Sequence, residues 1–202
     1  MKNKIVIIVF IIIGVLLLGY LGYRVYNDFA NTIEEENKQL DYLELYNYSL
    51  NEDDTDAYKT EFDNLRKVLN EEEVNYEEYA SSISKLFIID LYTIINKKGS
   101  TDIGGTEFIH NDLVDNFIEN MGSSLYKNVQ TNINGDRTQK LPEVSSVEVT
   151  EIKETVYKYN NEEYEGYTVN LTWTYVEDLG YQSSIKLTLI KSNNRLYIVK
   201  GE

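Results

Sequence analysis

The chain of 202 residues contains no cysteine, one histidine, one tryptophan and one proline. Without cysteine, disulfides and thiolate metal sites are excluded, and the single histidine, His110, has no second histidine with which to bind a metal. No phosphate-binding loop, nucleophile elbow, zinc-protease motif or dinucleotide fingerprint occurs in the sequence. We therefore expect no cofactor, no metal and no enzymatic activity, with hydrolysis by carboxylates alone left as an open alternative.

Basic residues are also scarce, because 19 Lys and Arg face 34 Asp and Glu, for a net charge of −15. Such a charge repels nucleic acid and anionic lipid headgroups, so a nucleic-acid partner is not expected. A basic partner would complement it. Acidity of this kind also keeps a protein in solution without any partner.

One stretch has no charge at all. Residues 5–23 (IVIIVFIIIGVLLLGYLGY) contain fourteen Ile, Val, Leu or Phe. As a helix they would be roughly 28 Å long, close to the hydrocarbon thickness of a bilayer of about 30 Å. The sequence predicts a transmembrane helix here, in contact with membrane lipid.

The flanks of this stretch predict its orientation. Lys2 and Lys4 precede it, whereas Arg24 is followed by the acidic run at 34–36. Positive flanks remain in the cytoplasm, so the C-terminal part is expected outside the cell, held by a single-pass anchor. A cleaved signal peptide is the alternative, but the apolar run is long and lacks a small-x-small cleavage site.

Four segments follow from this reading. Residues 1–4 form a cytoplasmic tail, 5–23 the membrane helix, 24–54 a juxtamembrane stalk and 55–202 an extracytoplasmic domain. The domain is long enough to bury a core of its own.

Three helices are predicted at the start of the domain. The first runs from about Thr55 to Leu69, with apolar residues on one face. The second runs from Asn75, a capping residue, toward Gly99, and is apolar nearly all round. A short extended piece at 106–109 precedes the third helix, which Asn111 would cap.

Asp90 lies on an apolar face of the second helix, so its carboxylate is expected to be partly buried. One hypothesis makes it a catalytic or ligand-binding acid. The other makes it an acceptor for backbone N–H groups, and the glycine turn at 102–105 (DIGG) would offer such amides.

The last sixty residues change to a period of two, which predicts four antiparallel strands in a meander and an α+β fold. Phase changes near residues 150–151 predict a bulge in the first strand. In the clearest strand, Tyr167, Trp173 and Tyr175 share one face. This face forms either core or the lining of a pocket.

Helices followed by a long meander, ending in LTLIKSNNRLYIV at 187–199, resemble the nuclear-transport-factor-like (cystatin-like) cone fold over residues 55–202. With the N-terminal anchor, the chain also resembles membrane-anchored assembly factors of type IV secretion and Gram-positive conjugation machines. Residues 83–90, 102–105 and 171–175 are similar to membrane-anchored proteins of low-GC Gram-positive bacteria. The resemblance implies a cone-like sheet around a helix and carries no activity or site residues.

Three functions are consistent with the sequence. The first is a single-pass, membrane-anchored interaction or scaffold domain that contacts another envelope protein. The second is a pocket for a small ligand or wall fragment, with Asp90, Tyr167, Trp173 and Tyr175 as candidate site residues. The third is carboxylate-based hydrolysis of a glycan. The partner, the ligand and the oligomeric state do not follow from the sequence.

Overall fold

The computed structural model describes Tyr20, Tyr23 and residues 39–202. The chain divides into two compact units, Met1–Asp41 and Tyr42–Glu202. The predicted membrane helix at residues 5–23 lies outside the described residues, apart from Tyr20 and Tyr23. Within the described part of the chain, no helix combines the length and the hydropathy that crossing a bilayer requires.

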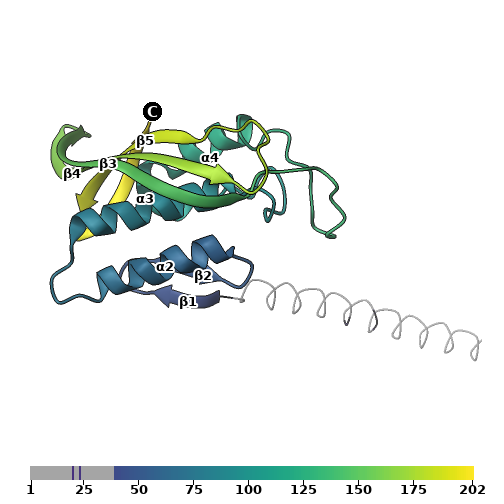
Figure 1. The fold of residues 1–202 in the computed structure, drawn as a ribbon, viewed down its shortest axis with the longest axis horizontal. Coiled ribbons are helices and arrows are strands. Elements are labelled where there is room, and N and C mark those ends of the chain that lie inside the picture. Colours follow the sequence, from purple (N-terminus) through teal and green to yellow (C-terminus); the bar gives the residue numbers. More distant parts are fainter. Residues whose placement is uncertain (1–19, 21–22, 24–38) are drawn as a thin grey trace, which may run out of the picture. The chain divides into compact units, whose positions relative to one another are not determined.

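The second unit is an α+β domain, as the sequence predicts (Figure 1). The sheet has four antiparallel strands in the order β3-β4-β5-β6. Helix α3 lies between helix α2 and this sheet (Figure 1). The elements are β1 (Gln39–Leu43), β2 (Tyr48–Asn51), α2 (Asp56–Leu69), α3 (Tyr76–Tyr92), two 3₁₀ turns η1 (Thr106–Phe108) and η2 (Asn111–Leu113), α4 (Val114–Ser123), β3 (Val144–Tyr159), β4 (Glu162–Tyr175), β5 (Ser184–Ser192) and β6 (Arg195–Gly201).

The N-termini of α2 and α3 follow from their capping residues. The Thr55 hydroxyl accepts a hydrogen bond from the amide of Tyr58. The Asn75 side chain accepts from the amides of Glu77 and Glu78 and donates to the Glu78 carboxylate, which satisfies amides that a helix start leaves free.

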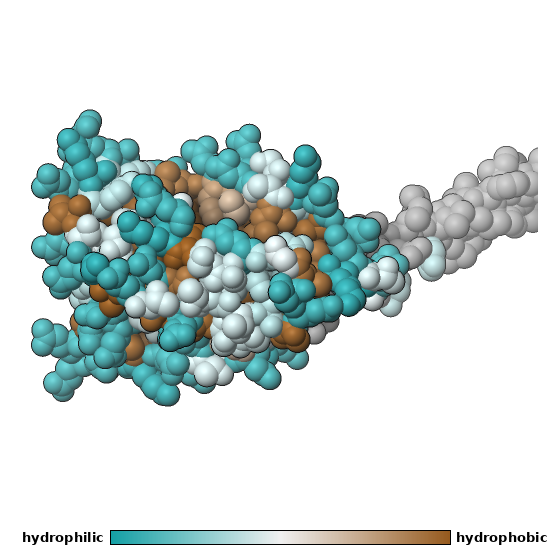
Figure 2. Space-filling view, turned by 45° about the horizontal axis from the view of Figure 1, so that its top comes forward, coloured by the Kyte–Doolittle hydropathy of each residue, from teal (hydrophilic) through white to brown (hydrophobic). Residues whose placement is uncertain are grey.

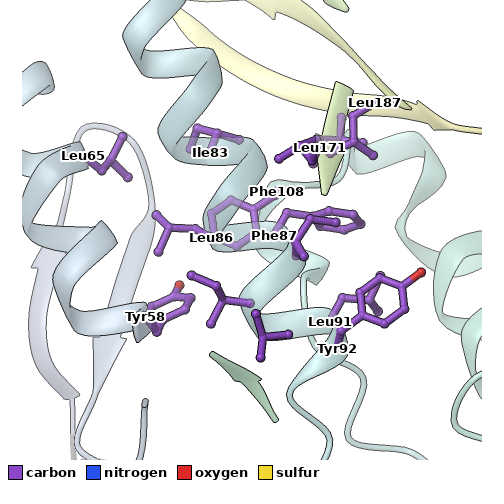
Figure 3. Packing of buried hydrophobic residues seen from close by; sticks show 14 of the residues in the cluster. Tyr58, Leu65, Ile83, Leu86, Phe87, Leu91, Tyr92, Phe108, Leu171 and Leu187 are labelled. Atoms are coloured by element: carbon purple, nitrogen blue, oxygen red, sulfur yellow. The ribbon is translucent and has the colours of Figure 1, made fainter. Parts of the chain in front are cut away.

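Helix α3 forms the centre of the core. Eleven of its seventeen residues are buried. Figure 3 shows Tyr58 and Leu65 of α2 on one side of this helix and Leu171 and Leu187 of the sheet on the other. A helix that is covered on two sides must be apolar nearly all round, which explains its sequence.

The second helix ends earlier than predicted. It stops at Tyr92, and Lys97, Lys98 and Gly99 lie in the following loop rather than in its last turn. The Thr93 hydroxyl accepts from the amide of Val144, and the amide of Ile94 donates to the Pro142 carbonyl. These long-range bonds compete with continued helix.

Residues 42–54, the last part of the predicted stalk, belong to the domain. The compact unit begins at Tyr42, and Tyr48 and Leu50 of β2 are buried in its core, Tyr48 with 0% exposure. The predicted domain start at residue 55 is therefore too late. Burial of Tyr48 depends on contacts with residues more than thirty positions away, which local periodicity cannot reveal.

The sheet has the predicted four antiparallel strands in meander order. A shift in pairing between Val149 and Glu151 confirms the expected bulge. Two-residue turns join β3 to β4 at Asn160–Asn161 and β5 to β6 at Asn193–Asn194, all four with positive φ. Asparagine tolerates this left-handed conformation, so these turns suit tight hairpins.

The segment between α3 and the sheet differs from the prediction in two places. Residues 106–108 form a 3₁₀ turn rather than an extended piece, although Ile109 bridges to Ile198 of β6. The following helix, α4, is short, and His110 rather than Asn111 caps the 3₁₀ turn that precedes it.

Candidate functional site

A cavity of about 440 Å³ lies between α3, α4 and the ends of β5 and β6. Phe87, Leu91 and Tyr92 of α3 form one wall, and Ile185, Leu187 and Ile198 of the sheet form another. On the face shown in Figure 2, hydrophobic surface is visible in patches between hydrophilic side chains.

Helix α4 provides the third wall. Its Phe117 and Met121, with Leu113 just before it, are spaced four residues apart and line the cavity. None of the ten residues of α4 is buried, although these three side chains pack against the core from one side. Because the helix does not close onto the sheet, its apolar face borders open space.

Polar groups lie at the edge of this cavity. Asn116 and Asn120 line it from α4, and Gln182 lines it from the segment before β5. The hydroxyl of Tyr92, which points away from the core in Figure 3, donates to the Gln182 side-chain oxygen at 3.2 Å. An apolar interior with a few polar groups is the usual composition of a small-molecule site.

The charged residues of the rim form a pair. Lys200 Nζ lies 2.6 Å from a carboxylate oxygen of Glu202. The pairing raises the pKa of Lys200 and lowers the pKa of Glu202, so both stay ionised near neutrality.

Two of the predicted site residues support the cavity from behind. Trp173 is 4% exposed, and its ring lies 4.7 Å from the Tyr92 ring that lines the cavity. The Tyr175 hydroxyl donates to the Gln182 carbonyl, and burial raises the pKa of Tyr175 to about 12. Neither residue lines the cavity itself.

Tyr167 lies elsewhere on the same strand. Six positions separate it from Trp173, which corresponds to about 20 Å along a strand. Tyr167 lines a second hollow with Tyr76, at the other end of the sheet. Tyr167, Trp173 and Tyr175 share one face of β4, as the sequence predicts. However, Tyr167 lies at the second hollow, whereas Trp173 and Tyr175 lie behind the cavity.

Asp90 does not line the cavity. Its carboxylate binds two groups of the loop that follows α3. One carboxylate oxygen accepts the amide of Gly105 at 2.6 Å, and the other pairs with the ammonium group of Lys97. The amide belongs to the glycine turn that the sequence pointed to. A Cβ on Gly104 would lie 2.1 Å from the Asp90 carbonyl oxygen, so only glycine fits there.

Sequence reasoning missed a second partly buried carboxylate, Glu107. One oxygen accepts from the Tyr58 hydroxyl at 2.8 Å, and the other accepts from the amide and hydroxyl of Ser49, both at 3.2 Å. Burial raises the pKa of Glu107 to about 7, against these hydrogen bonds and with help from nearby Asp90. Its partners are distant in sequence. The one local indication of this buried contact is that Glu107 is an isolated acid in an apolar stretch.

Asp54 lies close enough to interact with Asp90 and Lys97, and burial raises its pKa to about 6. Nevertheless, no group of three or more His, Asp or Glu side chains in the described part of the chain is arranged to hold a metal ion.

No protein-family model, curated protein or solved structure matches the chain.

Proposed function

We propose that the domain binds a small, largely apolar molecule in the cavity between α3, α4 and the ends of β5 and β6. The observation that carries the proposal is the cavity itself, of about 440 Å³ with apolar walls and a polar edge. Ligand sites for small molecules commonly have volumes of about 300 to 1,000 Å³ and the same composition.

The edge of the cavity favours a neutral polar group on the ligand. Lys200 and Glu202 pair with each other, and the Gln182 amide already bonds with Tyr92 and Ser184. The proposal therefore rests on the side-chain amides of Asn116 and Asn120 as the polar groups that a ligand meets. Amides donate and accept hydrogen bonds without charge. A hydroxyl or amide head on an apolar body fits this arrangement.

We propose a setting for this activity that rests on the sequence. The element order resembles a nuclear-transport-factor-like cone, in which a sheet wrapped around a helix can leave a pocket. Residues 5–23 would anchor the chain in the membrane with the domain outside the cell. The domain would then present its cavity to molecules near the membrane surface, as a non-enzymatic binding protein.

A fluorescence titration tests the proposal. N-phenyl-1-naphthylamine is a neutral apolar probe that becomes fluorescent in a dry site. We expect saturable binding to the full chain, and we expect Met121→Trp to weaken it about tenfold, because the indole fills the cavity. Ile118→Trp is the matched control, since Ile118 lies on the same helix, is 39% exposed and does not line the cavity.

Equal affinities for the two variants would place the probe elsewhere and refute the cavity as the binding site. The melting temperature of each variant is measured as well. It distinguishes a folded variant whose cavity is filled from a variant that has lost its fold.

Contact with another envelope protein is the second candidate function. A different surface supports it, because the sheet leaves part of its core-facing side uncovered at the end remote from the cavity. Hydrolysis of a glycan has less support, because Glu202, the one acidic side chain among the described residues that line the cavity, is paired with Lys200.

A further inference from the structure

The core-facing side of the sheet continues beyond the helices that cover it. In the register of β3 and β4, Ile152 is opposite Val169 and Val156 is opposite Glu165, and all four share one face because side chains alternate along a strand. Val169 is fully buried, whereas Val156 is 64% exposed. The same face therefore passes from core to solvent within a few residues.

A hollow of about 620 Å³ occupies this uncovered stretch. Tyr76, the first residue of α3, borders it on one side, and Tyr167 and Val156 border it from the sheet. At Gly166 the strands approach so closely that a Cβ would lie 1.9 Å from the Leu189 carbonyl oxygen, so backbone rather than a side chain forms this part of the wall.

Negative charge gathers around the hollow. Glu154 and Glu165 line it. Burial raises the pKa of Tyr167, and the carboxylates of Glu154, Glu77 and Glu165 raise it further, which places three acids near this ring. Lys191 is the one basic residue among the described residues that line it.

Lys191 shows that the Tyr76 ring on the wall of this hollow binds a cation. Its ammonium nitrogen lies 3.5 Å from the centre of the Tyr76 ring, a cation–π contact. In the described part of the chain it forms no ion pair within 4.0 Å, so Glu154 and Glu165 are not neutralised by direct contact with it.

We propose that this hollow is a docking site for an extended, basic segment of a partner protein, with Lys or Arg side chains on Glu154 and Glu165 and an apolar side chain against Val156 and Tyr167. We expect this occupant to be basic, because its positive charge would complement a chain of net charge −15. The site is independent of the proposed ligand cavity, because Lys191 and Ile185 stand near opposite ends of β5.

The probe is a fluorescein-labelled heptapeptide that alternates lysine and leucine, titrated by anisotropy against the full chain in neutral detergent. The test variant is Glu154→Gln/Glu165→Gln. The control is Glu72→Gln/Glu73→Gln, which removes the same charge from exposed positions outside the hollow. We expect the test variant to bind about fivefold to tenfold more weakly and the control to change less than about twofold.

Equal weakening by the two variants would mean that the peptide responds only to net charge and would overturn the proposal, as would a wild-type chain that does not bind.

Val156→Ser separates the apolar contribution, and we expect about threefold weaker binding. A tetramer of β-1,4-linked N-acetylglucosamine provides the last arm. Glycan binding that the test variant abolishes, without any effect on peptide binding, would assign the hollow to a carbohydrate instead.

Discussion

Asp90 holds two groups of the loop after α3 at once, an amide and an ammonium. The carboxylate also influences the ammonium: although burial lowers the pKa of Lys97, the charge of Asp90 more than compensates, so the net effect is a raised pKa. Side-chain exposures of 20% for Asp90 and 12% for Lys97 leave the pair largely shielded from water. Removing one partner leaves the other poorly solvated.

We expect Asp90→Asn to lower the free energy of unfolding by about 1 to 3 kcal/mol, because the ion pair with Lys97 is lost while one acceptor oxygen remains for Gly105. Asp90→Ala should cost more, because no acceptor remains. Chemical denaturation measures both. Adding Lys97→Met to Asp90→Asn should recover part of the loss.

A different result would reopen the hypothesis that Asp90 belongs to a functional site. If Asp90→Asn melts at or above the wild-type temperature and still reproduces the phenotype of a deletion, the carboxylate serves the activity rather than the fold.

Glu107 makes the stability of the domain depend on pH. Its pKa of about 7 in the fold exceeds the ordinary value of 4.5, so the folded chain holds an additional proton between these values. The stability gained by protonation is complete below the unfolded pKa and is lost as the pH rises through about 7.

We expect the free energy of unfolding to fall by roughly 3 kcal/mol between pH 4.5 and pH 8 from this group alone. Glu107→Gln should flatten the profile, and Asp54, whose pKa is about 6, should leave a smaller slope of the same sign. Glu71→Gln, at an exposed position, serves as the control. An unchanged slope in Glu107→Gln would show that the carboxyl does not titrate in this range.

At the residue scale, a hydrogen bond can be predicted from the sequence where its two partners are near each other in the chain. The cap at Asn75 involves neighbours three positions away, and the amide that Asp90 accepts is fifteen positions away on an obvious glycine turn. Glu107 instead joins Ser49 and Tyr58, 58 and 49 positions earlier. No local pattern encodes such a contact.

At the scale of elements, strand β2 is the largest departure from the prediction. The Tyr48 hydroxyl lies 2.8 Å from the Tyr79 hydroxyl and donates to the carbonyl of Leu196, and its ring stacks on Phe108. A strand of four residues is too short for its period to be distinguished from that of a helix. The long strand β4, in contrast, has enough alternation to be identified from sequence alone.

We expect residues 42–202 to unfold cooperatively and residues 55–202 to fail to do so, because the shorter chain lacks Tyr48 and Leu50 in its core. Tyr48→Ala should cost about 3 to 5 kcal/mol, and Tyr48→Phe, which removes only the hydroxyl, about 1 kcal/mol. Thermal melts of the four proteins provide the measurement. A cooperative melt of residues 55–202 at the same temperature would show that β2 contributes little.

At the scale of the whole molecule, the sheet carries two candidate binding surfaces near opposite ends of β5. The sequence predicts the sheet because alternation is local, but it does not predict the surfaces. Each depends on how far a helix covers the sheet: α4 leaves space over it, and α3 begins too late to cover Val156.

The orientation in the membrane can be tested with introduced cysteines, because the chain has none of its own. Ser124→Cys and Ser183→Cys, both at exposed positions, should react with an impermeant maleimide on intact cells. Asn3→Cys, before the predicted span, should react only after permeabilisation. The opposite pattern would reverse the predicted orientation, which rests on Lys2 and Lys4.

The position of β2 has a mechanical consequence. Tension on the chain ahead of Tyr42 passes through β1 and then this short strand before it reaches any helix. The side-chain bonds of β2 that come under load are those of Ser49 with Glu107 and of Tyr48 with Tyr79 and Leu196. Rupture there would expose an aromatic side chain while α3 and the sheet remain packed, so the domain would yield at its entrance before it yields at its core.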